Sequence, residues 1–338
     1  MDYDLTIVMS NYNQAQYIDK AIESVLSQKV NFNYKLLITD DNSQKDNSVE
    51  ILKSYENKYP QIIEVIYNKE NGRYLKNIMR AMAITKTPYF CLLDADDYWT
   101  DTRFLQRAYN FLEKNPNYVI YTENVNYLYE DGSTELFVKT KYLSKRTSFN
   151  NYLNGSAIIT QTTGQFYRNV LYSKGIPDMV KSAIGTKSER SFEGDYDRFV
   201  MHLIYGDAYF KNRVCGVYRI LSTSGIWAKL SSAKKHLIQM QTYYDYNRYF
   251  NYEYNSFFIN KMYKEFRCIL EEQGKDLCTL KEKSITFNLD DNLKDLYSYL
   301  YDNKRLINFE DFNIVTDCSF QTLLKEMIKR VKNKILNK

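Results

Sequence analysis

The sequence predicts an α/β protein with a mostly parallel sheet flanked by helices, followed by a helical C-terminal region. In roughly the first hundred residues, short apolar runs alternate with segments whose apolar residues recur at helical spacing. Four such β-α units in a row are typical of a parallel, doubly wound sheet. From about Leu230 onward the pattern is mostly helical, and no proline follows Pro177. A chain of 338 residues is long enough for one large domain or two modest ones.

The predicted strands of the first half are short and rich in Val, Ile and Leu. They cover 5–9, 34–39, 62–67 and 89–93. A helix is expected after each strand, where apolar side chains recur every three or four residues. These helices cover 15–26, 46–58, 71–85 and 102–113.

Beyond the fourth unit the rhythm changes. Two strands at 125–129 and 134–138 are expected to form a β-hairpin, because a short polar turn containing glycine joins them. Further along, the pattern predicts a helix and then strands, at 195–206 and 209–220. The loops from about 140 to 190 have no pattern that predicts their structure.

Composition places the chain among globular proteins, with 44% hydrophobic and 26% charged residues. The net charge is +5, and segment 320–338, with six basic residues and one Glu, carries all of it. Nucleic-acid binders spread basic residues over a face, so that class is not expected. The five cysteines are widely spaced without a Cys-x-x-Cys pair, which favours reduced thiols in a cytosolic protein. Neither a signal peptide nor a membrane span is expected, because the start lacks a basic region and no apolar stretch approaches about 18 residues.

Three carboxylates follow the fourth predicted strand within four positions, at Asp94, Asp96 and Asp97. Open α/β sheets bind ligands just beyond such strand ends. Carboxylates this close repel one another unless a cation lies among them, and a hard divalent cation with oxygen ligands usually carries substrate phosphates. The alternative is a solvated acidic turn that caps the next helix.

Polar residues also follow the first two strands, as Ser-Asn-Tyr-Asn at 10–13 and Asp-Asp-Asn-Ser at 40–43. Because these strands are parallel neighbours, their ends should face the same crevice as the acids at 94–97. Helix N-capping would account for one residue in each run, but not for the adjacent carboxylates Asp40 and Asp41. A carboxylate can accept a hydrogen bond from the N3–H of uracil, whereas cytosine has no donor there. Acids at a base pocket, with acids and metal at the phosphates, predict a uridine diphosphate ligand.

Four sequence blocks together resemble glycosyltransferase family 2, a large group of inverting sugar transferases with the GT-A fold. The blocks are Ile-Val-Met-Ser-Asn-Tyr-Asn at 7–13, Ile-Thr-Asp-Asp-Asn-Ser at 38–43, Asn71-Gly72 followed by Lys76-Asn77, and Leu-Asp-Ala-Asp-Asp at 93–97. They have the order and spacing of the family. The resemblance implies transfer of a hexose-type sugar from a UDP-sugar to a hydroxyl of a glycan or lipid-linked acceptor in bacterial surface polysaccharide synthesis. It also implies inversion at the anomeric carbon.

The resemblance continues in the second half, which is similar to the acceptor side of bacterial members. The matching blocks are 193–197, 206–207, 217–220 and 225–227. In the family this region supplies the catalytic base at the start of a helix, and the matching residue is Asp195, with Glu193 and Asp197 as the next candidates. Many members carry Arg-x-His after the last strand, where this chain reads Arg219-Ile220-Leu221. Leucine in place of that histidine predicts looser metal binding or a substitute for the histidine.

The resemblance also implies roles for the site residues. Asp195 would deprotonate the acceptor hydroxyl as general base, and a Mn²⁺ or Mg²⁺ ion would neutralise charge on the leaving UDP. Asp96 is the first expected metal ligand, Asp94 would reach the ribose or the metal, and Asp97 would complete the metal site and hold its geometry. Contacts to the uridine and its phosphates are expected from Asp41, Asp40, Ser10, Asn13, Lys76 and Asn77.

We expect a GT-A domain at 1–228, with a nucleotide-sugar half at 1–115 and an acceptor half at 116–228, followed by a helical region at 229–338. Three alternative classes of function are considered. A calcium-binding loop would begin Asp-x-Asp-x-Asp-Gly, but Tyr98 and Trp99 stand at the last two positions of that pattern, which excludes it. A phosphatase of the haloacid dehalogenase type also ends a strand in Asp-x-Asp, but on the first strand of its sheet, whereas here the motif follows the fourth. A catalytically degenerate scaffold that binds a nucleotide sugar is the alternative to an active enzyme.

Three further features have simpler interpretations. His202 and His236 lack neighbouring ligands and are expected to be structural, and the aromatic stretch 243–258 has helical spacing that favours helix packing over carbohydrate stacking. The apolar residues of 320–338 form a continuous helical stripe opposite basic side chains. This predicts either a helix packed on the body or, as we favour, an interfacial helix on the anionic inner face of the cell membrane, in an otherwise cytoplasmic protein.

Overall fold

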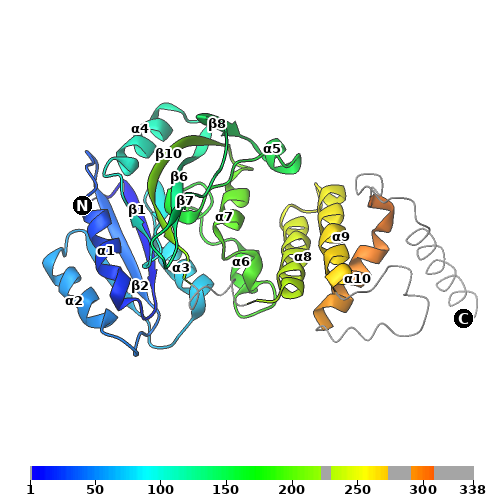
Figure 1. Ribbon diagram of the computed structural model, residues 1–338, viewed down its shortest axis with the longest axis horizontal. Helices are drawn as coiled ribbons and strands as arrows, with labels where there is room; N and C mark the ends of the chain where they lie inside the picture. The colour runs from blue at the N-terminus through cyan, green and yellow to red at the C-terminus, as the bar shows by residue number, and fades with distance from the viewer. Residues whose placement is uncertain (1, 222–229, 273–290, 308–338) are drawn as a thin grey trace, which may run out of the picture. The chain divides into compact units, whose positions relative to one another are not determined.

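The computed structural model describes residues 2–221, 230–272 and 291–307. The chain divides into two compact units, Met1–Gly225 and Ile226–Lys338 (Figure 1). The sequence places its domain boundary at 228/229, within a stretch outside the described residues. Each unit is described by itself below.

The first unit begins with the alternating strands and helices that the periodicity predicts. They are β1 (Leu5–Asn11), α1 (Ala15–Leu26), β2 (Tyr34–Asp40), α2 (Ser48–Lys58), β3 (Ile63–Tyr67), α3 (Arg73–Ile84), β4 (Tyr89–Leu92) and, after the short β5 (Tyr98–Trp99), α4 (Phe104–Lys114). All eight expected elements are confirmed, with ends that differ by no more than two residues. The clear separation of strand and helix periods in this stretch is the reason.

The rest of the first unit is less regular. It contains β6 (Tyr118–Leu128), β7 (Thr134–Leu136), β8 (Ser144–Thr147), α5 (Phe149–Leu153), β9 (Gln165–Arg168), α6 (Asp178–Ala183), α7 (Asp195–His202) and β10 (Asp207–Arg219), with short 3₁₀ turns η1 (Thr162–Gly164) and η2 (Glu189–Ser191). The predicted hairpin is present as β6 and β7. The expectation of a helix reaching residue 206 is wrong, because α7 ends at His202 and the chain turns toward β10.

The ten strands of the described residues form one sheet in the order β3-β2-β1-β4-β9-β6-β10-β5, with β7 beside β6 and β8 beside β10. β3, β2, β1 and β4 are parallel. β9 is antiparallel to both of its neighbours, β4 and β6, while β6 and β10 run parallel to each other. The α/β class with a mostly parallel sheet is therefore confirmed.

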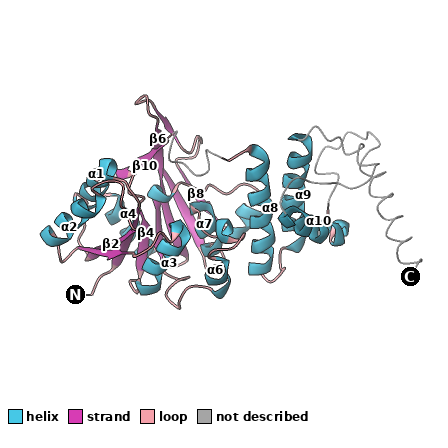
Figure 2. Ribbon diagram, turned by 90° about the horizontal axis from the view of Figure 1, so that it is seen from below, coloured by secondary structure: helices cyan, strands magenta, loops and turns pink. Residues whose placement is uncertain are grey.

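Helices cover both faces of the sheet (Figure 2). Side chains of α1, α2 and α4 pack with strand residues such as Ile7, Ile38 and Cys91 into one core. On the opposite face, α3 contacts β1 and β2, and α7 places His202 against the rings of Phe90 and Tyr167. A sheet buried on both faces leaves its strand ends as the place where polar side chains can gather.

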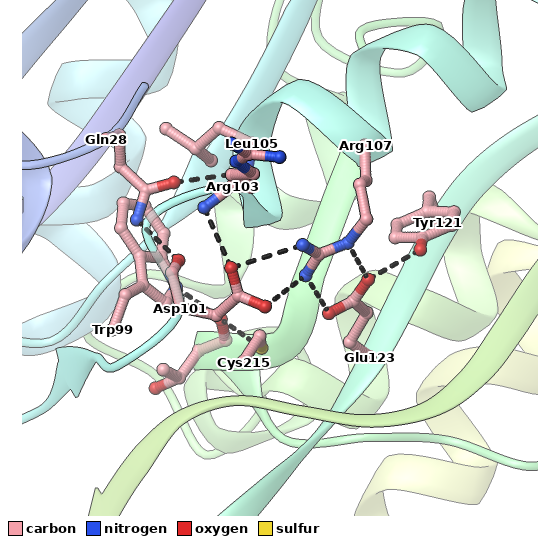
Figure 3. A network of polar contacts seen from close by, with 10 residues as sticks. Gln28, Trp99, Asp101, Arg103, Leu105, Arg107, Tyr121, Glu123 and Cys215 are labelled. Atoms are coloured by element: carbon pink, nitrogen blue, oxygen red, sulfur yellow. Dashed lines mark hydrogen bonds and ion pairs between the residues drawn. The ribbon is translucent and has the colours of Figure 1, made fainter. Parts of the chain in front are cut away.

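A partly buried ion-pair network joins α4 to β6 (Figure 3). The Arg107 guanidinium lies between two carboxylates, with Nη2 2.8 Å from Asp101 Oδ2 and 2.7 Å from Glu123 Oε2. Glu123 is wholly buried and also accepts a 2.6 Å hydrogen bond from the Tyr121 hydroxyl. A buried carboxylate is tolerated only when it is paired and hydrogen-bonded, so this network fixes how α4 packs on β6.

The described part of the second unit is helical, with α8 (Ser232–Tyr249), α9 (Asn255–Glu272) and α10 (Asp291–Asp302), and α8 and α9 lie side by side (Figure 1). Tyr246 and Phe258 are wholly buried between helices, which confirms the packing role predicted for the aromatic stretch. His236 Nδ1 lies 2.6 Å from Glu265 Oε2, a structural contact across the helix pair. Among the described residues, no helix combines the length and the apolar character that crossing a membrane requires.

Candidate active site

The site lies at the carboxyl ends of the parallel strands β2, β1 and β4. The parallel register pairs Asn11 with Asp40, and the amide of Leu93 donates to Val8 O at 3.0 Å. The loops that follow these strands therefore emerge at one edge of the sheet, as the sequence predicts. They carry the Asp40-Asp41 pair and the cluster at 94–97.

Asp40 is a buried anchor for the loops after β1 and β2. Its Oδ1 accepts from Asn11 Nδ2 at 2.8 Å and from the Ser43 hydroxyl at 2.6 Å, and its Oδ2 accepts from the Ser43 amide at 3.0 Å. The side chain of Ser43 in turn accepts from the Asn13 amide at 2.9 Å. These bonds hold the two loops together, so a uracil contact from Asp40 would have to use a carboxylate that already serves the fold.

Asp41 joins the second loop to the start of α3. Its Oδ1 accepts from the Gly72 amide at 2.6 Å and its Oδ2 accepts from the Arg73 amide at 3.1 Å. Left-handed backbone occurs in the loops after β1 and β2 and at the first residue of α3, with φ of 52° at Asn13, 61° at Asn42 and 63° at Arg73. Such angles are uncommon for residues other than glycine, and among those other residues asparagine adopts them most readily. The shape of this edge is thus set by hydrogen bonds between loops.

The other residues that the sequence predicts to contact the uridine and its phosphates lie around the same edge. Ser10 and Asn13 are partly buried in and after β1, and Asn13 Oδ1 accepts from the amides of Gln44 and Lys45. Lys76 pairs with Glu70 at 2.9 Å. Asn77 is wholly buried and accepts from Asn68 Nδ2 at 2.9 Å, so in this structure it supports α3 against the loop after β3.

The acid cluster follows β4 in a tight turn, in which the Asp97 amide donates to Asp94 O at 3.0 Å. Asp94 and Asp96 are half-buried, whereas Asp97 is 1% exposed. Burial, and the nearby carboxylate of Asp96, raise the pKa of Asp94 to about 7. Burial also raises the pKa of Asp96, while the Arg219 guanidinium opposes that rise. These two carboxylates would be stabilised by a cation.

Asp97 differs from its two neighbours because both of its oxygens are engaged by the protein. Oδ2 accepts from the Thr163 hydroxyl at 2.8 Å, and Oδ1 accepts from the Arg219 amide at 2.9 Å. It therefore ties the turn after β4 to η1 and to the end of β10. Burial and the carboxylates of Asp96 and Asp94 raise its pKa well above the usual range.

Asp195 begins α7 and is half-buried. Its Oδ1 accepts from the Tyr196 amide at 2.7 Å and its Oδ2 accepts from the Thr162 amide at 3.2 Å. Burial raises the pKa of Asp195, and the nearby Arg198 guanidinium opposes the rise. Of the other two candidates for the base, Glu193 pairs with Arg190 at 2.6 Å, and Asp197 is buried and accepts from the Gly194 amide at 3.0 Å.

Two residues that the sequence analysis did not single out connect the acids. The Tyr74 hydroxyl, in the first turn of α3, donates to Asp94 Oδ1 at 3.2 Å. Burial raises the pKa of Tyr74, and the carboxylates of Asp94 and Asp195 raise it further. Arg198 is 2% exposed beneath the same group, and its Nε and Nη2 lack hydrogen-bond partners in the described part of the chain. The one sequence feature that points to Arg198 is its position three residues after Asp195 in the predicted helix, which places both side chains on the same face of that helix.

The end of β10 places Arg219 at the acid cluster. Its guanidinium lies 4.9 Å from the centre of the Tyr17 ring and 5.1 Å from that of Tyr98, a geometry that favours a cation. Leu221, which stands where the family has histidine, is half-buried just beyond. The matching block at 225–227 lies outside the described residues.

The histidine of the first unit, His202, does not belong to the site. His202 is wholly buried, its Nδ1 lies 2.7 Å from Arg198 O, and burial lowers its pKa to about 3, so the ring is neutral. Within the described ranges, no group of three or more His, Cys, Asp or Glu side chains is arranged to hold a metal ion. Asp94 and Asp96 nevertheless fit a cation chemically, because they are oxygen donors whose mutual repulsion it would relieve.

Comparison with known proteins gives consistent results. A family model described as glycosyl transferase family 2 matches residues 6–175. The protein Rv1520 of Mycobacterium tuberculosis is 26% identical over 223 residues, which are 66% of this chain and 60% of that protein. The minor teichoic acid biosynthesis protein GgaB of Bacillus subtilis is 30% identical over 146 residues, 43% of this chain and 16% of that protein.

Among solved structures, S. aureus TarS 1–349 in complex with UDP-GlcNAc superimposes with a TM-score of 0.55. The superposition covers 91% of this chain and 82% of that chain, with 14% sequence identity. At this identity the likeness shows a shared GT-A fold. The match to Rv1520 spans about three fifths of that relative's own length.

Proposed function

Because the chain belongs to glycosyl transferase family 2, we propose that it transfers a hexose-type sugar from a UDP-sugar to an acceptor hydroxyl, with inversion at the anomeric carbon. The single observation that carries this proposal is that Asp94, at the end of β4 and hydrogen-bonded to the Tyr74 hydroxyl, lies within electrostatic range of Asp195, at the start of α7. One carboxylate belongs to the expected donor side and the other to the expected acceptor side. An inverting displacement needs both at one place.

Asp195 is the proposed general base. The acceptor oxygen attacks the anomeric carbon, the bond from that carbon to the diphosphate oxygen breaks, and the acceptor proton passes to the Asp195 carboxylate. Burial raises the pKa of this group, which makes it a better proton acceptor than an exposed aspartate. Its two hydrogen bonds from the Tyr196 and Thr162 amides hold the carboxylate in a fixed orientation.

Asp96 and Asp94 are the residues that would hold Mn²⁺ or Mg²⁺. When bound, such an ion supplies positive charge to the diphosphate as it leaves. Asp97 would hold the geometry of this turn through Thr163 and Arg219, a role that its two engaged oxygens favour over direct ligation. The Arg219 guanidinium, kept beside Asp96 by Tyr17 and Tyr98, is the proposed counterpart for the missing histidine.

The uridine would lie at the ends of β1 and β2, lined by Ser10 and Asn13, with Asp41, or second to it Asp40, at the uracil. Lys76 would exchange its partner Glu70 for a donor phosphate, and Asn77 would support the pocket from behind. The TarS complex holds UDP-GlcNAc in a related fold, which supports a UDP-sugar for this chain as well.

We further propose that the acceptor is a glycan or a lipid-linked glycan of a bacterial surface polymer, and that the protein works in the cytoplasm at the inner face of the membrane. The relative GgaB is named for minor teichoic acid biosynthesis, which supports a surface polymer. The basic stripe at 320–338, which would contact anionic lipid, lies outside the described residues and stays a prediction from the sequence.

The direct test is a donor screen by thermal shift with UDP-glucose, UDP-galactose and their N-acetyl forms, with and without Mn²⁺, followed by measurement of UDP release. A ligand that binds only the folded state raises the unfolding midpoint. We expect one donor to stabilise the protein more in the presence of Mn²⁺ and to release UDP slowly into water. Stabilisation without any turnover on a glycan panel would favour the scaffold alternative, for which Leu221 is the motivating observation. No response to any UDP-sugar would overturn the proposal.

A further inference from the structure

Two tyrosines form a half-buried pair next to the acid cluster, on the side away from the expected uridine pocket. Tyr127 of β6 and Tyr218 of β10 are directly paired in the parallel register, and their ring centres lie 5.7 Å apart. In the sheet order, β6 and β10 lie beyond β4 and β9, whereas β1 and β2 lie on the other side of β4. We call Tyr127 and Tyr218 the tyrosine platform.

The platform is close to the reacting groups. Tyr218 directly precedes Arg219, whose amide donates to Asp97 Oδ1. Burial raises the pKa of Tyr218, and the carboxylates of Asp97, Asp94 and Asp195 raise it further. Burial likewise raises the pKa of Tyr127, with added contributions from Glu135 and Asp195. The geometry agrees, because η1, whose Thr162 amide donates to Asp195 Oδ2, contacts both β6 and β10.

Aromatic neighbours pack against Tyr127, and part of the platform stays accessible. The Phe137 ring centre lies 5.2 Å from that of Tyr127, and the Tyr129 ring centre lies 6.1 Å from it. Aromatic residues in the interior of the same two strands, Tyr121 and Phe210, are 4% and 1% exposed, whereas both platform tyrosines keep a partly exposed surface. Aromatic rings with a hydroxyl at one end suit a ligand that is partly apolar and partly polar.

We infer that the tyrosine platform binds the acceptor as a sugar ring, which stacks on the phenols and presents a hydroxyl to Asp195. This rests on the proposed function and names the class of acceptor. A pyranose offers C–H groups to an aromatic face and hydroxyls around its edge. The acceptor oxygen must lie within hydrogen-bond reach of the base, which is met by a ring held beside Asp195.

The charges around the platform argue against a polyol phosphate in the same place. The Asp195 carboxylate lies within electrostatic range of the platform and would repel a phosphate, whereas Glu135 is already paired with Lys139. The Arg219 guanidinium is stacked on Tyr17 and Tyr98, beside Asp96. A neutral ring avoids this repulsion, so the observations favour a sugar unit at the point of transfer.

Saturation-transfer NMR on the full chain, with UDP and Mn²⁺ present, tests the inference. The probes are the methyl β-glycosides of glucose, galactose and N-acetylglucosamine, with glycerol 3-phosphate as the anionic polyol. We expect at least one glycoside to be saturated by the wild-type protein, and its affinity to fall by about tenfold or more in Tyr127→Ala and Tyr218→Ala, the scale of a lost stacking contact. Tyr127→Phe, which keeps the ring, and Tyr205→Ala, at an exposed residue beyond the C-terminal end of α7, should bind as the wild type does.

UDP calorimetry on every variant separates a failure of the tyrosine platform from a failure of the proposed function. Unchanged UDP affinity with lost glycoside binding in the alanine variants supports the platform. Equal glycoside binding in the alanine variants and the wild type, or saturation of glycerol 3-phosphate alone, overturns it. If the wild-type protein does not bind UDP, the proposed function fails instead.

Discussion

Substitution of Asp97 separates a metal ligand from a residue that holds the site together. Its carboxylate is 1% exposed and accepts from the Thr163 hydroxyl at 2.8 Å and from the Arg219 amide at 2.9 Å. Burial and two neighbouring carboxylates raise the pKa of Asp97 well above the usual range. An asparagine side chain has nearly the same shape without the charge, and it offers an acceptor oxygen and an NH₂ donor group.

The hydrogen bonds of Asp97 predict different losses of folding stability for its substitution by asparagine and by alanine. In Asp97→Asn, the amide oxygen can accept from the Arg219 amide and the amide nitrogen can donate to the Thr163 hydroxyl, so both bonds are kept. In Asp97→Ala, two buried donors lose their acceptor at about 1–3 kcal/mol each, or about 2–6 kcal/mol together. For a unit of this size each kcal/mol lowers the unfolding midpoint by about 2–4 °C.

Thermal unfolding and UDP calorimetry with Mn²⁺ provide the assays. We expect Asp97→Asn to unfold close to the wild-type midpoint and to keep metal-dependent UDP binding, and Asp97→Ala to lose several degrees. An asparagine variant as unstable as the alanine variant would refute the proposed exchange of hydrogen bonds. A stable asparagine variant that no longer binds UDP in a metal-dependent way would instead place Asp97 among the metal ligands, as the sequence suggests.

Four further predictions concern the other groups. Asp96→Ala should remove metal-dependent UDP binding in calorimetry, and wild-type affinity with Mn²⁺ present would contradict the ligand assignment. Asp195→Asn should lower turnover by about 10²–10⁴ while UDP-sugar affinity stays within a few-fold, and near-normal turnover would move the base to Glu193 or Asp197. Because burial raises the pKa of Asp195 and the base must be ionised, kcat/KM should fall as the pH drops through a value above that of an exposed aspartate; a profile that stays flat down to the ordinary carboxylate range would count against this. Full-length protein should float with anionic liposomes at low salt more than a chain ending at Cys318, and equal flotation would leave 320–338 as a packing helix.

The first unit shows which parts of the fold could be predicted from sequence. The strands and helices up to Lys114 were predictable because each has an apolar period that is local to it. β9 was missed because its four residues, Gln165–Arg168, carry two polar side chains and gain their stability from partners far away along the chain. Strand pairing over such distances leaves no signal in a short window.

The sequence predicts which acidic residues gather at the site, but it predicts the role of each of them less well. Strand ends brought Asp40, Asp41 and the cluster at 94–97 to one edge, as topology requires. Which oxygens remain accessible depends on loop conformations, such as the left-handed backbone at Arg73 that lets its amide reach Asp41. Tyr74 had no distinctive spacing, and its importance follows from the direction in which the first turn of α3 presents its hydroxyl.

The position of β9 also has a consequence for how the polypeptide acquires its shape during synthesis. β4 is complete at Leu92, yet the neighbour that covers its outer edge is not made until Arg168. Until then the ribosome holds a growing sheet with a bare edge, which is the kind of surface that pairs with other chains. A fragment covering only the nucleotide-sugar half would keep that edge permanently, so we expect it to aggregate when it is expressed without the segment that contains β9.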